Sequence, residues 1–118
     1  MEYVDGFVVP MPKKKVGEYR KIAKLASKVW RDHGALDYRE CVADDVQKGK
    51  VTSFPRSVKQ KPGETVVFAW ITYKSRKQRD AILKKVMKDK RLAKFMDPKT
   101  MPFDTKRMIW GGFKTIVT

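Results

Sequence analysis

One acidic residue, Asp5, interrupts an apolar run near the start of the chain, EYVDGFVVP. An ionised carboxylate is costly to bury without a partner, so Asp5 either faces solvent or lies in a wet cavity that the protein uses. In a cavity, its pKa would rise and the carboxylate could act as a general base on a bound molecule. The alternative is that Asp5 pairs with an arginine or a tyrosine across a subunit interface and only fixes geometry.

Side chains alternate between the two faces of a strand, so Asp5 shares a face with Tyr3 and Phe7, opposite Gly6. Gly6 and its neighbouring valines suit close packing against a helix, which assigns Asp5 to the face away from the helices. In the run TVVFAWITY, the bulkier aromatic set suits the wall of a cavity on that same face. The candidate catalytic residues are Asp5 and Glu40, and the expected pocket lining comprises Tyr3, Phe7, Tyr38, Phe68, Trp70 and Trp110.

Metal sites and nucleophilic catalysis find little support in the sequence. His33 is the single histidine, which excludes zinc and iron sites that need two or more, and Cys41 is the single cysteine. His33 precedes Gly34 at the expected end of a helix, where it suits the helix dipole. A lone cysteine is usually a small buried hydrophobe. We therefore expect no metal and no cofactor.

The formal net charge of +15 favours a polyanionic partner or two solvated helix surfaces. Basic residues gather at the starts of the two expected helices, where free amide groups and cations together would attract a phosphate. This pattern makes an RNA-binding accessory protein the alternative function, without the exposed aromatic sheet signature of many RNA-binding domains. The candidate anion or nucleic-acid contacts are Lys13, Lys14, Lys15, Arg76, Lys77 and Arg79.

Hydrophobic spacing predicts the elements that position these residues. Apolar residues spaced by three and four predict a helix over 16–33, and alternation predicts strands over 3–9, 35–43, 65–73 and 105–117. Ser75 begins a second helix with capping-box spacing to Gln78. The segment 44–63 is predicted to be a long loop with a short helical turn or strand near Phe54. A further short helix is expected to carry Leu92, Phe95 and Met96.

The resulting order, β-α-β-β-α-β, predicts a single domain over residues 1–118 with the ferredoxin-like α+β fold: a four-stranded antiparallel sheet with both helices on one face. The other face would keep its aromatic residues in water unless something covered it. We therefore expect a homodimer. No segment approaches the roughly 20 apolar residues of a membrane span, and the start lacks a signal peptide. With one cysteine, these features indicate a cytoplasmic protein.

Four stretches, YVDGFVVP, HGALDYRECVADD, GETVVFAWITYKSR and MPFDTKRMIWGGFK, resemble the YbaA-like family of bacterial proteins nearly end to end. The resemblance implies a dimeric α+β barrel, in which the sheets of two protomers pack together. Related barrels hold small ligands, among them cofactor-free monooxygenases, muconolactone isomerases and haem-degrading enzymes. It also implies that the loop DPKTMPFD covers the pocket mouth, adding Phe103 and Asp104 to the pocket, although Asp104 equally suits a turn cap.

The leading hypothesis is thus a small cytoplasmic dimer that binds a small molecule between its sheet and its partner. Whether the protein is also a cofactor-free enzyme stays open, because fold resemblance alone does not assign an activity.

Overall fold

The computed structural model describes residues 1–95 and 97–118, and the predicted position of Met96 in a short helix lies outside them. Four strands form one antiparallel sheet in the order β2-β3-β1-β4. Their bounds are β1 Tyr3–Pro12, β2 Asp37–Val42, β3 Glu64–Tyr73 and β4 Ile109–Lys114. The two longest strands, β1 and β3, lie at the centre, as expected for segments that are apolar on both faces. The predicted ferredoxin-like α+β fold is confirmed.

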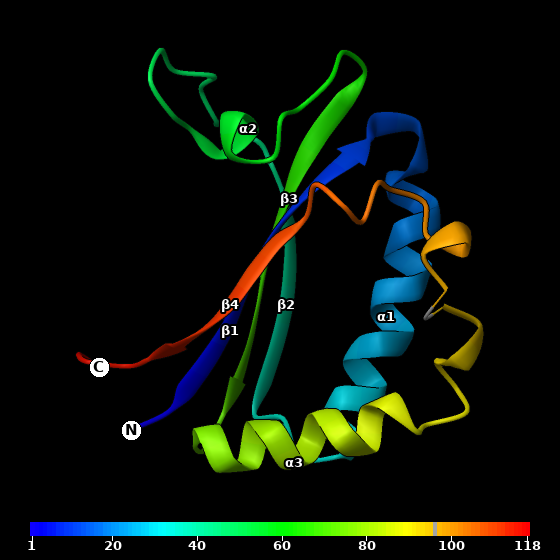
Figure 1. The fold of residues 1–118 in the computed structure, drawn as a ribbon, viewed down its shortest axis with the longest axis vertical. Coiled ribbons are helices and arrows are strands. Elements are labelled where there is room, and N and C mark those ends of the chain that lie inside the picture. The colour runs from blue at the N-terminus through cyan, green and yellow to red at the C-terminus, as the bar shows by residue number, and fades with distance from the viewer. Residues whose placement is uncertain (96) are drawn as a thin grey trace.

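Two helices cover one face of the sheet (Figure 1). Helix α1 spans Val16–Asp32 and α3 spans Arg76–Met87. Val29 of α1 and Ile82 of α3 pack against Ile71 and Tyr73 of β3 in one buried cluster. Helix α3 crosses the end of the sheet where β1 begins and β3 ends (Figure 1). We call the covered side of the sheet the helix face and the other side the outer face.

Local signals explain where these elements begin and end. The side chain of Ser75 accepts a hydrogen bond from the Gln78 backbone N–H at 3.1 Å, as the capping-box spacing predicts. The expected helical turn near Phe54 is α2, Phe54–Ser57, which Ser53 caps in the same way. In this turn Val58 packs on Val8 and Val66, so α2 covers one end of the outer face, opposite α1 (Figure 1).

The connection from α3 to β4 is as long as the connection from β2 to β3, and it follows a different path. It contains the short 3-10 turns Ala93–Phe95 and Pro98–Thr100, and its residues Leu92 and Phe103 are buried. Figure 1 shows this connection running along α1 before it returns to the sheet. It therefore adds a third wall beside the sheet and α1.

The register shows that the face predicted for Asp5 was wrong. Asp5 lies opposite Ile71 of β3, whereas Gly6 lies opposite Trp70. Paired residues in antiparallel strands point to the same side, and Ile71 packs against the helices. Asp5 therefore lies on the helix face, and Gly6 lies on the outer face. Phe68 and Trp70 also lie on the outer face, so they share no space with Asp5.

Strand β4 contains the glycine pair Gly111 and Gly112, and glycines inside a strand often mark a bulge or a close backbone approach. Pairing with β1 continues without a bulge, and the close approach is at Gly112. A methyl group there would lie 2.7 Å from the Arg79 guanidinium nitrogen Nη2 and would also collide with the Tyr3 ring. At Gly111 the nearest atom is 3.7 Å away, in the Phe113 ring.

These two glycines provide a matched test of the packing. We expect Gly112→Ala to lower the free energy of unfolding by about 1–3 kcal/mol, because the buried Tyr3 and Arg79 side chains must move. Gly111→Ala adds the same methyl group at an ordinary van der Waals distance from its neighbours, so it should leave stability unchanged or slightly higher. Urea denaturation of both variants measures the difference. Equal stabilities would contradict the close packing at Gly112.

Candidate functional site

A cavity of about 380 Å³ lies on the helix face, between the sheet, α1, the end of α3 and the connection to β4. Its wall is mostly aliphatic and aromatic, with Ala69 and Ile71 of β3 on the sheet side and Ala23 and Ala26 of α1 opposite. Polar character comes from a small set of lining residues: Asp5, Tyr19, Tyr38, Glu40 and Thr105. An apolar cavity with a few fixed polar groups is typical of a small-molecule site.

Asp5 is almost fully buried, with 1 % of its surface exposed, and it lies on β1 beside Ile71 of β3. The Tyr73 hydroxyl donates a hydrogen bond to Asp5 Oδ2 at 3.0 Å, and the Trp30 indole N–H donates to that hydroxyl at 3.2 Å. Burial raises the pKa of Asp5, against the opposing effects of the Tyr73 hydrogen bond and the Arg79 charge. The Asp5 carboxyl group is thus shielded from water, and its polar neighbours offset only part of the cost of burying it.

Arg79 supplies that compensation from α3. Its Nη1 atom lies 3.5 Å from Asp5 Oδ1, and its Nη2 atom donates to the Tyr3 hydroxyl at 3.2 Å. The guanidinium also lies over the Tyr3 ring, with 5.0 Å between its central carbon and the ring centroid. The alternative for Asp5, a pair with an arginine or a tyrosine across a subunit interface, is therefore replaced by pairs within one chain.

Glu40 forms the second polar centre of the cavity. It accepts hydrogen bonds from the hydroxyl groups of Tyr38, at 2.7 Å, and of Tyr19. Burial raises the pKa of Glu40, and the two hydrogen bonds partly oppose that effect. Burial and the Glu40 charge raise the pKa of both tyrosines, so these phenols keep their protons.

The two carboxyl groups are too far apart to share a proton. Asp5 and Glu40 lie on either side of β3, opposite Ile71 and Ala69 respectively. Strand spacings near 4.8 Å and a rise near 3.4 Å per residue place their Cα atoms roughly 12 Å apart. The space between them, above Ala69 and Ile71, is wide enough for a ring-sized molecule. This is not the arrangement of a carboxylate dyad.

The structure brings together only part of the predicted pocket. Six of the predicted residues line the cavity: Asp5, Phe7, Tyr38, Glu40, Phe103 and Trp110. Phe68 and Trp70 lie on the outer face, and Tyr3, beside Arg79, packs behind Asp5. The prediction of a pocket between the sheet and a partner subunit is therefore wrong for this cavity, which lies under the protein's own helices.

Asp104 caps a turn, which was the alternative to its role in the pocket. It accepts hydrogen bonds from the Lys106 backbone N–H and from Arg107, whose guanidinium also binds Glu64 through two bonds of 2.7 and 2.8 Å. The hydrogen bond from Arg107 lowers the pKa of Glu64. This cluster fastens the start of β3 to the segment before β4, outside the cavity.

Sequence reasoning missed three residues that shape the site. Tyr19 and Trp30 lie on the apolar stripe of α1 and Tyr73 ends β3, and their polar atoms hold the two carboxyl groups. Arg79 was predicted as an anion contact, and that prediction is wrong because the side chain is buried against Asp5. Its spacing to the buried Ile82 and Val86, three and seven residues on, is the signal that would have placed it on the inner stripe of α3.

The remaining basic residues do not form one surface. Lys13, Lys14 and Lys15 form an exposed 3-10 turn, which the Lys13 N–H ties to Gly63 before β3. Arg76 and Lys77 are exposed just after the other end of β3. A strand of 10 residues separates the two groups by roughly 30 Å.

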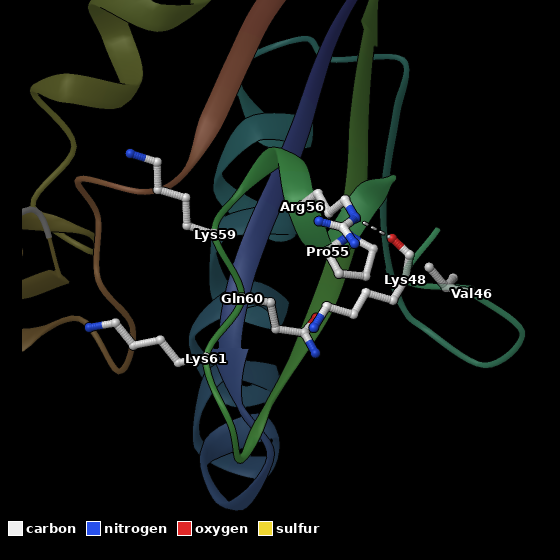
Figure 2. Close-up of a pocket in the computed structure, with 7 residues that line it drawn as sticks. All are labelled: Val46, Lys48, Pro55, Arg56, Lys59, Gln60 and Lys61. Atoms are coloured by element: carbon white, nitrogen blue, oxygen red, sulfur yellow. Dashed lines mark hydrogen bonds between the residues drawn. The ribbon is translucent and has the colours of Figure 1, made fainter. Parts of the chain in front are cut away.

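A second hollow, of about 410 Å³, lies beside α2 and has basic walls. Figure 2 shows that Lys59 and Lys61 extend away from Arg56 and Lys48, so the cations do not converge. Arg56 itself donates to the backbone carbonyls of Lys48 and Gly49 and holds the loop in place. The hollow therefore lacks the converging donors of a phosphate site.

His33 and Cys41 have no part in the cavity. The His33 ring nitrogen Nε2 lies 2.8 Å from Asp89 Oδ2 and joins the end of α1 to the segment after α3. Cys41 is exposed on the outer face of β2. Within residues 1–95 and 97–118, no cluster of three or more potential metal-ligating side chains occurs. In the same part of the chain, no helix is long and apolar enough to cross a bilayer.

Comparison with known proteins places the sequence in a family. The model of a protein family of unknown function, DUF1428, matches residues 2–105. The chain belongs to this family. It is 49 % identical over 117 residues to the uncharacterised protein YbaA of Escherichia coli K12, covering 99 % of this chain and 98 % of that protein. The YbaA protein of Shigella flexneri matches to the same extent. The predicted membership of the YbaA-like family is confirmed.

A solved structure supports the fold at lower similarity. A dimeric ferredoxin-like protein from an uncultured marine organism superposes with a TM-score of 0.63 at 10 % identity, covering 99 % of this chain and 97 % of the other. At that identity the likeness concerns the fold alone. The family is described as one of unknown function and the YbaA proteins as uncharacterised, so the function must be argued from the cavity.

The opposite pKa shifts of Glu40 and Glu64 give a paired test of the site electrostatics. The raised pKa of Glu40 means that the folded state holds more protons above the ordinary value of 4.5, so its contribution to stability falls as pH rises from there to the raised pKa. The lowered pKa of Glu64 has the reverse effect, and its contribution is lost as pH falls.

We expect Glu40→Gln to gain stability relative to the wild type as the pH rises above about 4.5, and Glu64→Gln to lose stability relative to the wild type as the pH rises toward about 4.5 from below. Urea titrations at several pH values give both slopes. Slopes of the same sign would show that the buried position of Glu40 is misassigned.

Proposed function

We propose that this protein binds a small, mainly apolar molecule in the cavity between its sheet and α1. The observation that carries the proposal is the cavity of about 380 Å³, whose apolar wall contains the buried carboxyl group of Asp5 and the half-buried carboxyl group of Glu40. Domains of this size rarely keep such a space, because interiors pack to near crystal density. Placing carboxyl groups in an apolar wall costs stability, and a binding site explains that cost better than core packing does.

Asp5 and Glu40 are also the groups that would move a proton if the bound molecule reacts. Both carboxyl groups line the cavity, and burial raises the pKa of each. A carboxyl group whose pKa is raised is a better proton acceptor and can return the proton to its ligand. Binding is the function proposed; acid–base chemistry on the same ligand would be an extension of it and would need no cofactor.

We infer in addition that the protein is a homodimer joined through its outer faces. Several large apolar side chains are exposed on that face, namely Phe68 on β3 and Ile109 and Phe113 on β4. Contiguous apolar surface of this kind usually marks an interface. The similar marine structure is described as a dimeric ferredoxin-like protein, which supports a dimer here without indicating the interface. Such a dimer would leave the cavity under the helices accessible in each subunit.

Filling the cavity tests the binding proposal. We expect the wild type to bind a neutral, environment-sensitive naphthalene ketone dye, with a blue shift of the dye's fluorescence. Ala23→Leu adds bulk to the cavity wall on α1 and should weaken dye binding at least five-fold, on the order of 1 kcal/mol. Ala81→Leu makes the same change at an exposed position of helix α3 and should bind like the wild type. Equal affinities for all three proteins would refute the assignment of the cavity.

A charge on the outer face tests the dimer. Phe68→Lys should convert a dimer to a monomer in sedimentation velocity runs, because the new ammonium group would have to be buried unpaired. Leu36→Lys is the matched control: Leu36 is 41 % exposed and Phe68 is 42 % exposed, but Leu36 precedes β2, away from the outer face. A wild type that sediments as a monomer at all concentrations would disprove the dimer.

A further inference from the structure

We propose that the cavity binds a protonated organic amine with an apolar body of one or two rings, and that the Glu40 carboxylate pairs with its ammonium group. The inference rests on the proposed binding function and adds the class of molecule bound. It follows from three features of the described residues: Glu40 has no cationic partner, the cavity wall carries no positive charge, and aromatic rings lie across the sheet from Glu40.

The first feature is that neutral groups alone contact the Glu40 carboxylate. The Tyr19 hydroxyl donates to one of its oxygens and the Tyr38 hydroxyl to the other. In the described part of the chain, no lysine, arginine or histidine pairs with it. Asp5, the other carboxyl group of the wall, has Arg79 as its partner. In a chain with 28 lysines and arginines, a half-buried carboxyl group without a cation is suited to one supplied by a ligand.

A molecule in the cavity can reach Glu40 without displacing the phenols. Glu40 lines the cavity and is only partly buried. Each of its oxygens accepts one phenol hydrogen bond, and a carboxylate oxygen has room for a second donor. Burial raises the pKa of Glu40, and a neighbouring ammonium group would lower that pKa again by stabilising the carboxylate. Amine and carboxylate therefore each favour the charged form of the other.

The sheet register places an aromatic pair at a suitable distance from this carboxylate. Glu40, Ala69, Phe7 and Trp110 lie side by side across the four strands, on the helix face. The rings of Phe7 and Trp110 stack with their centroids 6.2 Å apart, and the small side chain of Ala69 lines the floor between them and Glu40. Two strand spacings put the Cα atoms of Glu40 and Phe7 roughly 10 Å apart. A body of one or two rings spans that gap, and aromatic walls accept organic cations.

The wall suits other ligand classes less well. No lysine or arginine lines its described part, and Lys94, which lies over the Phe95 ring, is outside the lining. A carboxylate or phosphate would meet Glu40 and find neutral donors alone, the Trp110 indole N–H and the Thr105 hydroxyl. A neutral ligand would leave Glu40 without a counter-charge. An ammonium group avoids both costs.

A series with one body and three head groups tests the assignment. The probes are 2-naphthylmethylammonium, 2-naphthylmethanol and 2-naphthoate, each measured by displacement of the neutral dye and by calorimetry on the wild-type protein near pH 8. We expect the ammonium compound to bind about ten-fold more tightly than the alcohol, because a charge-assisted hydrogen bond is about twice as strong as a neutral one. The naphthoate should bind least. An alcohol or a naphthoate that binds as tightly as the ammonium compound overturns the inference.

Glu40→Gln then identifies the carboxylate. Glutamine keeps the size of the side chain and an acceptor for the phenols but removes the charge, so the preference for the ammonium compound over the alcohol should shrink to within about three-fold. Glu18→Gln makes the same change at an exposed position of α1 outside the cavity and should keep the full preference. A preference that persists in folded Glu40→Gln overturns the role of Glu40. Should that variant fail to fold, the wild-type series still decides the ligand class.

Ala23→Leu shows whether the ammonium compound is inside the cavity. Ala23 lines the wall on α1, so the added bulk should weaken the ammonium compound and the alcohol alike, at least five-fold. An ammonium compound that binds this variant as tightly as the wild type is held elsewhere, and that result overturns the inference.

The two proposals fail differently. If the dye and all three naphthalene compounds fail to bind, the proposed binding function is refuted. If they bind without a preference for the ammonium group, binding stands and the amine is refuted.

Discussion

The buried ion pair between Asp5 and Arg79 determines how the helices sit on the sheet. It ties the first strand to α3, and its neighbours extend the link: Tyr73 joins it to β3, and Trp30 joins it to α1. Removing one partner from a buried pair leaves an uncompensated charge, which usually costs about 3–5 kcal/mol. Four elements thus depend on one carboxylate, and the wall of the cavity beside it is fixed by the same contacts.

Gly112 of the neighbouring strand β4 leaves the space that the pair of Asp5 and Arg79 needs. Arg79 and Tyr3 occupy the volume above Gly112 that a side chain would otherwise fill. The glycine pair in β4, which reads from the sequence as a feature of strand geometry, is in fact part of the support for Asp5. The two ends of the network lie more than a hundred residues apart in the chain, so local pattern could not connect them.

Much of the fold could be predicted from the periodicity of hydrophobic residues. The face of Asp5 could not, because periodicity does not show which side of the sheet the helices cover. Alternation correctly groups Asp5 with Phe7, and Phe68 with Trp70, because side chains in a strand alternate whatever their partners are. It does not say which group meets the helices. The register decides that, and it sets Gly6 opposite Trp70 and Asp5 opposite Ile71. Side-chain size was the wrong guide to the face that the helices cover, because Asp5 has its charged partner, Arg79, on α3.

The candidate site was less predictable than the fold because its polar contacts are long-range. Tyr38 and Glu40 share a face by alternation, yet the phenol of Tyr19, which completes the Glu40 site, comes from α1. Nothing near Glu40 in the sequence indicates that contact. Arg79 is the instructive case: its basic neighbours Arg76 and Lys77 favour a surface role, while its helical spacing to Ile82 indicates burial. Spacing was the better signal, because burial depends on which side of the helix a residue occupies.

The net charge of the whole chain is positive, whereas the ionisable groups that line the cavity include two carboxyl groups. The net charge of +15 resides largely on exposed side chains, whereas the cavity wall carries two carboxyl groups and, in its described part, no cation. At an ionic strength of about 0.1 M, exposed charges are screened beyond about 10 Å, but groups in a dry site interact at lower effective dielectric. The ligand that we propose for this cavity would therefore experience mainly Asp5 and Glu40, and the basic exterior would contribute little to its selection.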